Sequence, residues 1–275
     1  MKIPDRLLPL LENGLVQEVV RPLMSGKEAA VYIVVSDDRY CVAKVYKEAI
    51  HRSFRQKAAY TEGRAVRNSR QKRAMEKGSK YGREQAEAAW QTAEVDALYK
   101  LAAAGVRVPK PLVFSEGVLL MEIVLDPDDM PAPRLCDCSF TPEQAWNSHN
   151  FVMHQVLLML CAGMVHGDLS EYNVLLSKNG PVIIDLPQAV DAAQNRNARS
   201  ILLRDVNAIT QFLGRFCPPL LESRYAEEMW ALYERAQLFP DTQLTGRWRG
   251  SSRQADVRGV QREIQAAARD ARFRR

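Results

Sequence analysis

The first third of the chain alternates apolar and polar residues in the manner of β-strands. Residues 15–23 (LVQEVVRPL) alternate loosely, and the segments AVYIVVS and YCVAKVYK follow. The segment SGKEA interrupts the first two runs, and the turn-like DDR joins the last two. We therefore expect a series of antiparallel hairpins with a glycine loop at its first turn.

A helical pattern extends over residues 84–104 and ends at Gly105, a residue type that favours helix termination. Its apolar stripe includes Trp90 and Leu98. Glu94 is one turn from both, so this carboxylate lies on the same stripe. A carboxylate on a buried face needs a cationic partner.

The rest of the chain predicts two more strands and then mainly helices. The segment KPLVFSEGVLLMEIV indicates two strands, and a connector rich in proline and aspartate follows at 126–134. Thr141 opens a second helix with a capping-box pattern, which continues to Gly163. We expect its inward face to contain Trp146, Val152, Val156, Leu157 and Leu160. After the strand PVIIDL, two helical patterns from about residue 198 are separated by two prolines. A β-rich part followed by a helical part predicts an α+β fold.

Composition narrows the class of protein. The 275 residues are 47% hydrophobic, which supplies enough apolar mass for one large domain or two lobes. No apolar run approaches the roughly 18–20 residues that a membrane span needs, so we expect no membrane association. The five cysteines contain one close pair, Cys136 and Cys138, without a second pair at zinc-ligand spacing. A reduced, cytoplasmic protein is expected.

Charge is distributed unevenly. Residues 48–88 contain 11 Lys/Arg against 5 Asp/Glu, and residues 244–275 contain 9 Arg against 3 acids. Each segment carries a net charge of +6 against +5 for the whole chain, so the remainder is acidic. Such segments can bind phosphate backbones by releasing counterions, and they can equally be solvated surface.

The stretch VHGDLSEYNVLL has the spacing of a phosphoryl-transfer loop. Asp168 and Asn173 are five residues apart, as in the D-x-x-x-x-N loop of kinases. Asp185 follows at the end of an apolar strand, and a hairpin between them would bring Asn173 and Asp185 to one edge. Their oxygens suit Mg²⁺. We predict Asp168 as the catalytic aspartate and the other two as metal ligands, with His166 as a brace for the loop.

Lys44 lies inside the apolar segment VAKVY, where an unpaired ammonium group would be costly. Pairing with Glu94 would satisfy both residues and would orient the lysine toward phosphates. Helical phase favours Glu94 as the partner; Glu84, Glu87 and Asp96 are alternatives.

Two further segments fit an ATP site. Ser25, Gly26 and Lys27 lie between two strands, where the glycine permits close approach to phosphate oxygens. Glu122 and Ile123 follow the apolar run VLLM and are predicted at a hinge, where backbone groups would meet the adenine edge. Met121 is predicted to face the back of that pocket.

The motifs SGKEAAVY, AKVYK, AGVRVPKPL, APRL, VHGDLSEYNVLL and IIDLPQAV occur in this order over residues 15–215, and together they resemble the RIO-type atypical kinases. Phe-Gly does not follow Asp185 and no Ala-Pro-Glu motif is found, so a conventional activation segment is not expected. Met24-Ser25 stands where this family usually has Ser-Thr.

The resemblance implies a bilobal protein-kinase-like fold that uses ATP and Mg²⁺ or Mn²⁺. An N-lobe would cover 1–125, with a basic flexible insertion at 48–82, and a helical C-lobe without an activation segment would cover 126–243. A basic tail would occupy 244–275. It further implies that Lys44 contacts the α/β phosphates, that Glu94 anchors it, and that the protein acts as a serine/threonine kinase or an ATPase in ribosome assembly.

Two other functions remain open. The HGDL motif also resembles small-molecule kinases of the aminoglycoside and choline type, which lack an activation segment too. The basic segments 48–88 and 244–275 favour a module that binds rRNA or a ribosomal subunit, with nucleotide setting its conformation. The substrate, which could be the protein itself, is not determined by the sequence.

Overall fold

The computed structural model describes residues 3–26, 29–47 and 93–248. Lys27, the predicted insertion at 48–82 and the first part of the predicted helix 84–104 lie outside the described residues, as does the predicted tail from residue 249 onward. None of the helices in the described ranges is both long and apolar enough to cross a membrane.

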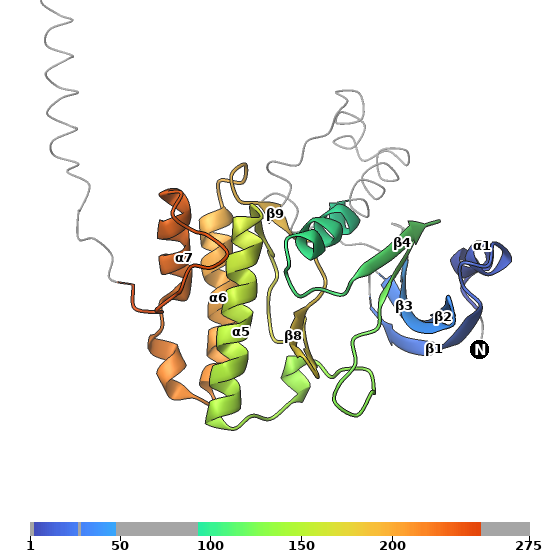
Figure 1. Ribbon diagram of the computed structural model, residues 1–275, viewed down its shortest axis with the longest axis horizontal. Coiled ribbons are helices and arrows are strands. Elements are labelled where there is room, and N and C mark those ends of the chain that lie inside the picture. The colour runs from blue at the N-terminus through green and yellow to red at the C-terminus, as the bar shows by residue number, and fades with distance from the viewer. Residues whose placement is uncertain (1–2, 27–28, 48–92, 249–275) are drawn as a thin grey trace, which may run out of the picture.

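An antiparallel sheet of five strands forms the first part of the fold (Figure 1). Its strands are β1 (Glu18–Ser25), β2 (Ala29–Ser36), β3 (Arg39–Tyr46), β4 (Pro111–Ser115) and β5 (Val118–Glu122), in the order β1-β2-β3-β5-β4. Asp37 and Asp38 both have positive φ and join β2 to β3 in a two-residue turn, which suits the twist of a hairpin. The predicted hairpins are confirmed.

The two faces of this sheet have different neighbours. Cys41, Ala43 and Val45 of β3 pack with Leu7 and Leu10, which belong to the short helices η1 (Asp5–Leu7) and α1 (Leu8–Glu12). Because side chains alternate along a strand, the intervening residues of β3 face the other way. That second face is covered by the helix over residues 93–103.

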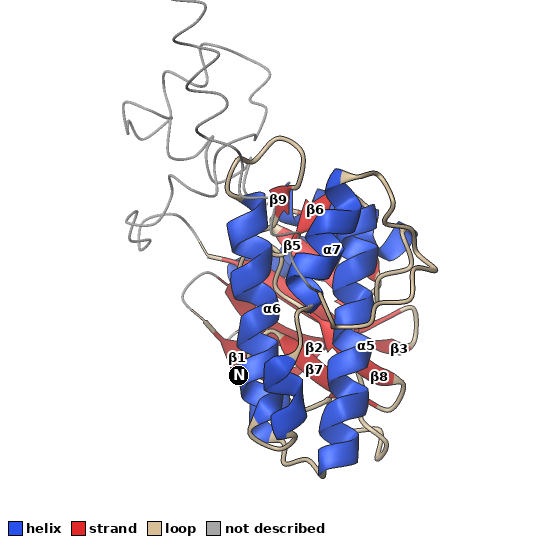
Figure 2. Cartoon of the chain, turned by 90° about the vertical axis from the view of Figure 1, so that its left-hand side faces the viewer, coloured by secondary structure: helices blue, strands red, loops and turns tan. Residues whose placement is uncertain are grey.

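Helices dominate the second part of the chain (Figure 2). The elements in order are η3 (Leu135–Asp137), α5 (Pro142–Cys161), β6 (Met164–Val165), β7 (Val174–Ser177), β8 (Gly180–Ile183), β9 (Val190–Asp191), α6 (Ala198–Gly214), η4 (Pro218–Glu222) and α7 (Tyr225–Glu234). Helix α5 packs against α6, α7 and the hairpin β7–β8, and its Leu157 and Leu160 are fully buried. The α+β fold class predicted from the pattern is confirmed.

Helix α5 begins with the predicted capping box, because Thr141 and Gln144 exchange side-chain to backbone hydrogen bonds. The prediction that Trp146 faces inward is wrong, since this side chain is 43% exposed. The small residue Ala145 takes the buried position in the first turn, and Trp146 lies at the edge of the buried stripe.

Hydrogen bonds connect α7 to residues beyond the predicted lobe boundary at residue 243. Glu228 of α7 is buried and accepts hydrogen bonds from the backbone N–H groups of Thr245 and Gly246, at 3.0 and 2.7 Å, and from the Thr245 hydroxyl at 2.9 Å. Leu244 packs against the main core. Residues 244–248 therefore belong structurally with α7.

Candidate active site

The loop between β6 and β7 presents Asp168 to solvent. The Asn173 side-chain amide donates to the backbone carbonyl of Asp168 at 2.8 Å, and the Asn173 N–H donates to the Ser170 carbonyl at 3.0 Å. Partial desolvation of the carboxyl group raises the pKa of Asp168, and the neighbouring charge of Asp185 adds to this rise. Asp168 is thus an exposed residue on a loop that is held by its own hydrogen bonds.

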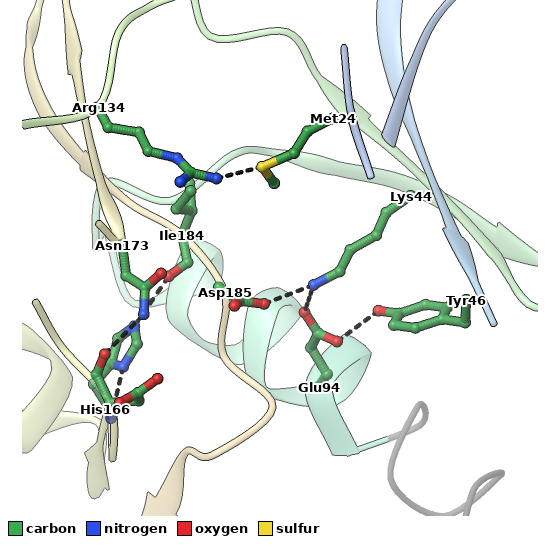
Figure 3. Close-up of polar contacts among 10 residues, drawn as sticks. Met24, Lys44, Tyr46, Glu94, Arg134, His166, Asn173, Ile184 and Asp185 are labelled. Atoms are coloured by element: carbon green, nitrogen blue, oxygen red, sulfur yellow. Dashed lines mark hydrogen bonds and ion pairs between the residues drawn. The ribbon is translucent and has the colours of Figure 1, made fainter. Parts of the chain in front are cut away.

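His166 connects this loop to the backbone directly before Asp185 (Figure 3). Its Nε2 lies 3.0 Å from the Ile184 carbonyl, and its Nδ1 accepts the Asp168 N–H at 3.2 Å. These partners require a neutral ring with its proton on Nε2. Burial lowers the pKa of His166 to about 4, which keeps the ring neutral. Both ring nitrogens are engaged, so the geometry suits a structural role and not that of a base.

The hairpin β7–β8 brings Asn173 and Asp185 to one edge. The Ile184 N–H donates to the Asn173 carbonyl at 3.0 Å, which closes the open end of the hairpin. Asp185 follows with φ +66°, a left-handed conformation that aspartate tolerates better than most residues. This turn directs its side chain toward Lys44 (Figure 3).

Lys44 connects the sheet, the helix over 93–103 and Asp185. Its ammonium group forms an ion pair with Glu94 and another, at 2.9 Å, with Asp185. The Tyr46 hydroxyl donates to the second oxygen of Glu94 at 2.8 Å. Of the alternative partners, Asp96 is exposed, while Glu84 and Glu87 lie outside the described residues.

The charges in this cluster reinforce one another. Burial alone would lower the pKa of Lys44, but the charges of Glu94 and Asp185 outweigh it and raise that pKa well above its usual value. Burial would raise the pKa of Asp185, and the adjacent Lys44 ammonium holds it below its usual value instead. Lys44 and Asp185 therefore remain ionised near neutral pH.

The glycine loop lies at the end of β1. The Gly26 N–H donates to the Ala29 carbonyl at 2.9 Å, which closes the turn. Lys47, which the sequence argument did not single out, donates to the Gly26 carbonyl at 2.6 Å and to the Ser25 hydroxyl at 3.1 Å. Its place three residues after Lys44 in the AKVYK motif is the signal that could have identified it.

Glu122 ends β5, and Met121 and Ile123 flank it as partly buried residues. The Glu122 carboxylate pairs with Arg107 at 2.8 Å, and its backbone N–H donates to the Lys110 carbonyl at 2.9 Å. Burial would raise the pKa of Glu122, but the hydrogen bond from Arg107 keeps it low. Because this N–H already donates to Lys110, the backbone group of Glu122 that could contact an adenine is its carbonyl oxygen.

Sequence patterns did not indicate that helix α6 supports the loop that bears Asp168. Asp205 is 2% exposed and accepts the Gly167 N–H at 2.7 Å, while Arg204 donates to the Gly167 carbonyl and pairs with Asp205 at 3.1 Å. Asp205 lies on the buried stripe of α6 beside Val206 and Ile209. A charged residue at an apolar position of that helix was the available signal.

A steric constraint explains why residue 167 is a glycine. Its φ is +89°, and a Cβ at this position would lie 2.1 Å from the Gln188 carbonyl oxygen. The segment after Asp185 therefore packs directly against the catalytic loop, at the position where many protein kinases carry arginine. The chain then reaches α6 at Ala198 without room for a long activation segment.

The oxygen donors of Asp168, Asn173 and Asp185 fit a magnesium-type cation. Asp185 and Asp168 offer carboxylate oxygens, and Asn173 offers an amide oxygen because its nitrogen is the donor to Asp168. Hard oxygen ligands in small number suit an ion that also binds phosphates and water. The described residues contain no group of three or more His, Cys, Asp or Glu that could hold a metal ion by themselves.

Comparison with known proteins extends these observations. The family model for the RIO domain matches residues 30–226. The RIO-type serine/threonine-protein kinase Rio1 of Haloferax volcanii is 35% identical over 208 residues, which cover 75% of this chain and 67% of the relative. The serine/threonine-protein kinase rio1 of Schizosaccharomyces pombe is 31% identical, and its human counterpart RIO1 is 29% identical.

The matched part makes up different shares of these relatives. It covers 76% of this chain in both eukaryotic comparisons, but 41% of the yeast protein and 35% of the human protein. The chain thus corresponds to less than half the length of these two eukaryotic relatives. The resemblance seen in the motifs is confirmed, and the chain belongs to the RIO domain family, whose curated members found here are serine/threonine-protein kinases.

Proposed function

We propose that this protein transfers the γ-phosphoryl group of ATP to a serine or threonine hydroxyl of a protein, or to water, as an atypical kinase or ATPase. The observation that carries the proposal is the position of Lys44, which contacts both Glu94 and Asp185. That contact joins the sheet bearing the glycine loop to the hairpin bearing Asn173. The lysine that would bind phosphates and the loop that bears Asp168 therefore belong to one site, the proposed nucleotide cleft.

Each group has a role in this reaction. Lys44 binds phosphate oxygens while Glu94 holds it in place, and Ser25 and Gly26 approach the phosphates from β1. Lys27 has the same predicted role. Asp168 orients the acceptor hydroxyl and takes its proton as the phosphorus–oxygen bond to ADP breaks and the new ester bond forms. The raised pKa of Asp168 favours proton acceptance.

The nucleotide and the metal are assigned to the same cleft. Asn173 and Asp185 would hold Mg²⁺ or Mn²⁺, which neutralises phosphate charge when bound. The adenine would lie at the hinge, with Met121 behind it and the backbone of Glu122 and Ile123 at its edge. The Arg107–Glu122 pair fixes this hinge.

Two variants and one label test this function. We expect Asp168→Asn to abolish phosphoryl transfer while ATP binding remains largely intact. Asp185→Asn should weaken magnesium-dependent nucleotide binding as well. Arg224→Gln, on the exposed side of the Arg224–Glu227 pair, is the matched control and should behave as wild type. Full turnover in either aspartate variant would contradict the assignment.

The destination of the label separates the candidate activities. With ATP labelled at the γ-phosphate, label on protein supports the kinase and label released as phosphate supports the ATPase. Label on an aminoglycoside or choline would favour the small-molecule kinase that the HGDL motif also suggests. The family match supports the protein substrate.

We further propose a cytoplasmic protein that binds rRNA or a ribosomal subunit through its basic segments 48–88 and 244–275, each with a net charge of +6. Binding should then weaken steeply with salt concentration, and removal of the tail should reduce that slope. The truncation should follow Trp248, because Glu228 binds Thr245 and Gly246. An unchanged slope would contradict a role for the tail.

A further inference from the structure

Arg134 of the APRL motif lies beside the candidate site, and none of the functions assigned above uses it. The backbone around this residue is fixed. The Leu176 N–H of β7 donates to the Pro133 carbonyl at 2.8 Å, Arg134 itself forms a β-bridge with Leu175, and Leu135 is fully buried. The arginine is thus attached to the same hairpin that carries Asn173.

Its side chain extends toward Met24 at the end of β1 (Figure 3). The guanidinium group donates to the sulfur of Met24, the residue that directly precedes Ser25 and Gly26 in the glycine loop. Arg134 is also close enough to Asp185 for its charge to help lower the pKa of that carboxyl. The guanidinium therefore lies between the glycine loop and the edge that carries the proposed metal ligands Asn173 and Asp185.

The charge of Arg134 is not neutralised within the described part of the chain. A thioether sulfur is only a weak hydrogen-bond acceptor, and no carboxylate of the described residues forms an ion pair with this arginine. The neighbouring cations Lys44, Arg107 and Arg204 each have a carboxylate partner. A half-buried arginine that has no anionic partner among residues 3–26, 29–47 and 93–248 has its planar set of donors available for a phosphate group.

We propose that Arg134 binds the terminal phosphate of ATP and thereby distinguishes ATP from ADP. The inference rests on the proposed function, because it requires ATP in this cleft. Lys44 faces the cleft from β3 and Arg134 faces it from the hairpin side, so the two cations approach the phosphates from opposite directions. In the absence of ATP, the Met24 sulfur holds the guanidinium group in its position.

The test compares two nucleotides in the full chain. We expect Arg134→Gln to lower the affinity for the magnesium complex of the β,γ-imido analogue of ATP by about tenfold or more, the effect of one lost hydrogen bond between charged groups. The affinity for magnesium ADP should change less than twofold, which also shows that the variant is folded. Arg224→Gln is the control and should change neither affinity.

Two results would overturn the inference: an equal loss of affinity for both nucleotides, or no loss for either. If Arg134→Gln does not fold, Arg134→Lys replaces it and should lose affinity for the triphosphate alone, by about threefold. If the wild-type protein transfers phosphate and Arg134→Gln has the wild-type ratio of affinities for the ATP analogue and ADP, only this inference is contradicted. A wild-type protein that binds neither nucleotide contradicts the proposed function as well.

Discussion

The backbone N–H of Gly167 donates to the buried carboxylate of Asp205 at 2.7 Å, so helix α6 directly holds the loop that bears Asp168. Arg204 binds the Gly167 carbonyl from the same helix. The peptide groups on both sides of Gly167 are therefore fixed by neighbouring residues of one helical turn. Asp168 is presented from this support.

Stability should depend on the protonation of Asp205. Burial raises its pKa to about 6, so the folded protein binds this proton more tightly than the unfolded chain does. The stabilising contribution is complete at about pH 4 and is lost as the pH rises through about 6. We expect Asp205→Asn to lack this decrease, measured as the free energy of unfolding in urea from pH 4 to 7. Identical pH dependence in both proteins would contradict the role of Asp205.

Gly167→Ala should destabilise the protein and impair turnover. Its Cβ would lie 2.1 Å from the Gln188 carbonyl oxygen, and the catalytic loop would have to move. We expect a loss of stability of about 2 kcal/mol or more, from overpacking together with backbone strain. Gly163→Ala is a matched control, because Gly163 also has positive φ (+73°) but no atom within 4 Å of its Cβ position. Equal losses would show that strain alone matters.

Variants of the Lys44–Glu94 pair should lose activity and stability to different extents. Lys44→Met leaves the Glu94 carboxylate, 4% exposed, without a cation, although the Tyr46 hydroxyl still donates to it. We expect a loss of about 3 kcal/mol, the usual effect of breaking a buried pair. Adding Glu94→Gln should restore much of that stability while phosphoryl transfer remains absent.

Denaturant unfolding and transfer assays on the single and double variants check this prediction. The exposed pair Arg224–Glu227 is the reference, where Arg224→Met should cost less than about 1 kcal/mol. A double variant no more stable than Lys44→Met would contradict the buried-charge explanation.

Glu228 predicts a loss of stability without a loss of catalysis. Its buried carboxylate accepts hydrogen bonds from Thr245 and Gly246, and a glutamine would replace one acceptor oxygen by a donor. We expect Glu228→Gln to cost about 1–3 kcal/mol, with unchanged transfer per folded molecule. Glu227→Gln, at the neighbouring, partly exposed position, should cost less than 1 kcal/mol. Thermal or urea unfolding of both variants tests this difference.

The Lys44–Glu94 contact could be predicted from the sequence because the period of a strand and the period of a helix each place one of these residues on a buried face. Alternation along β3 places Lys44 on one face of the sheet, and helical phase places Glu94 on the apolar stripe of the facing helix. Each residue was anomalous in its own element, and the two anomalies had opposite charge. Asp168, Asn173 and Asp185 were equally accessible, because their spacing depends on a short local hairpin.

Other contacts join residues that are far apart in the sequence. Asp205 was visible as a charged residue on the apolar stripe of α6, but its partner across the fold is the Gly167 N–H, a backbone group that no side-chain pattern indicates. Arg134 contacts the thioether of Met24, which carries no complementary charge. Trp146 shows a different limit. Hydrophobicity alone selected the large residue for the buried face of α5, whereas packing against the neighbouring helices placed Ala145 there.

The closed hairpin β7–β8 has a mechanical consequence for the cleft. Its open end is joined at Asn173 and Ile184, its strand β7 carries Arg134 through Leu175, and its turn is tied to Asp129 through Lys178 at 2.8 Å. These contacts connect Arg134 and Asn173 to one hairpin. Lys44 extends from β3 to Asp185, and Arg134 extends from the hairpin side to Met24 at the end of β1. A nucleotide bound between these two cations would therefore be held by the sheet and by the hairpin at once.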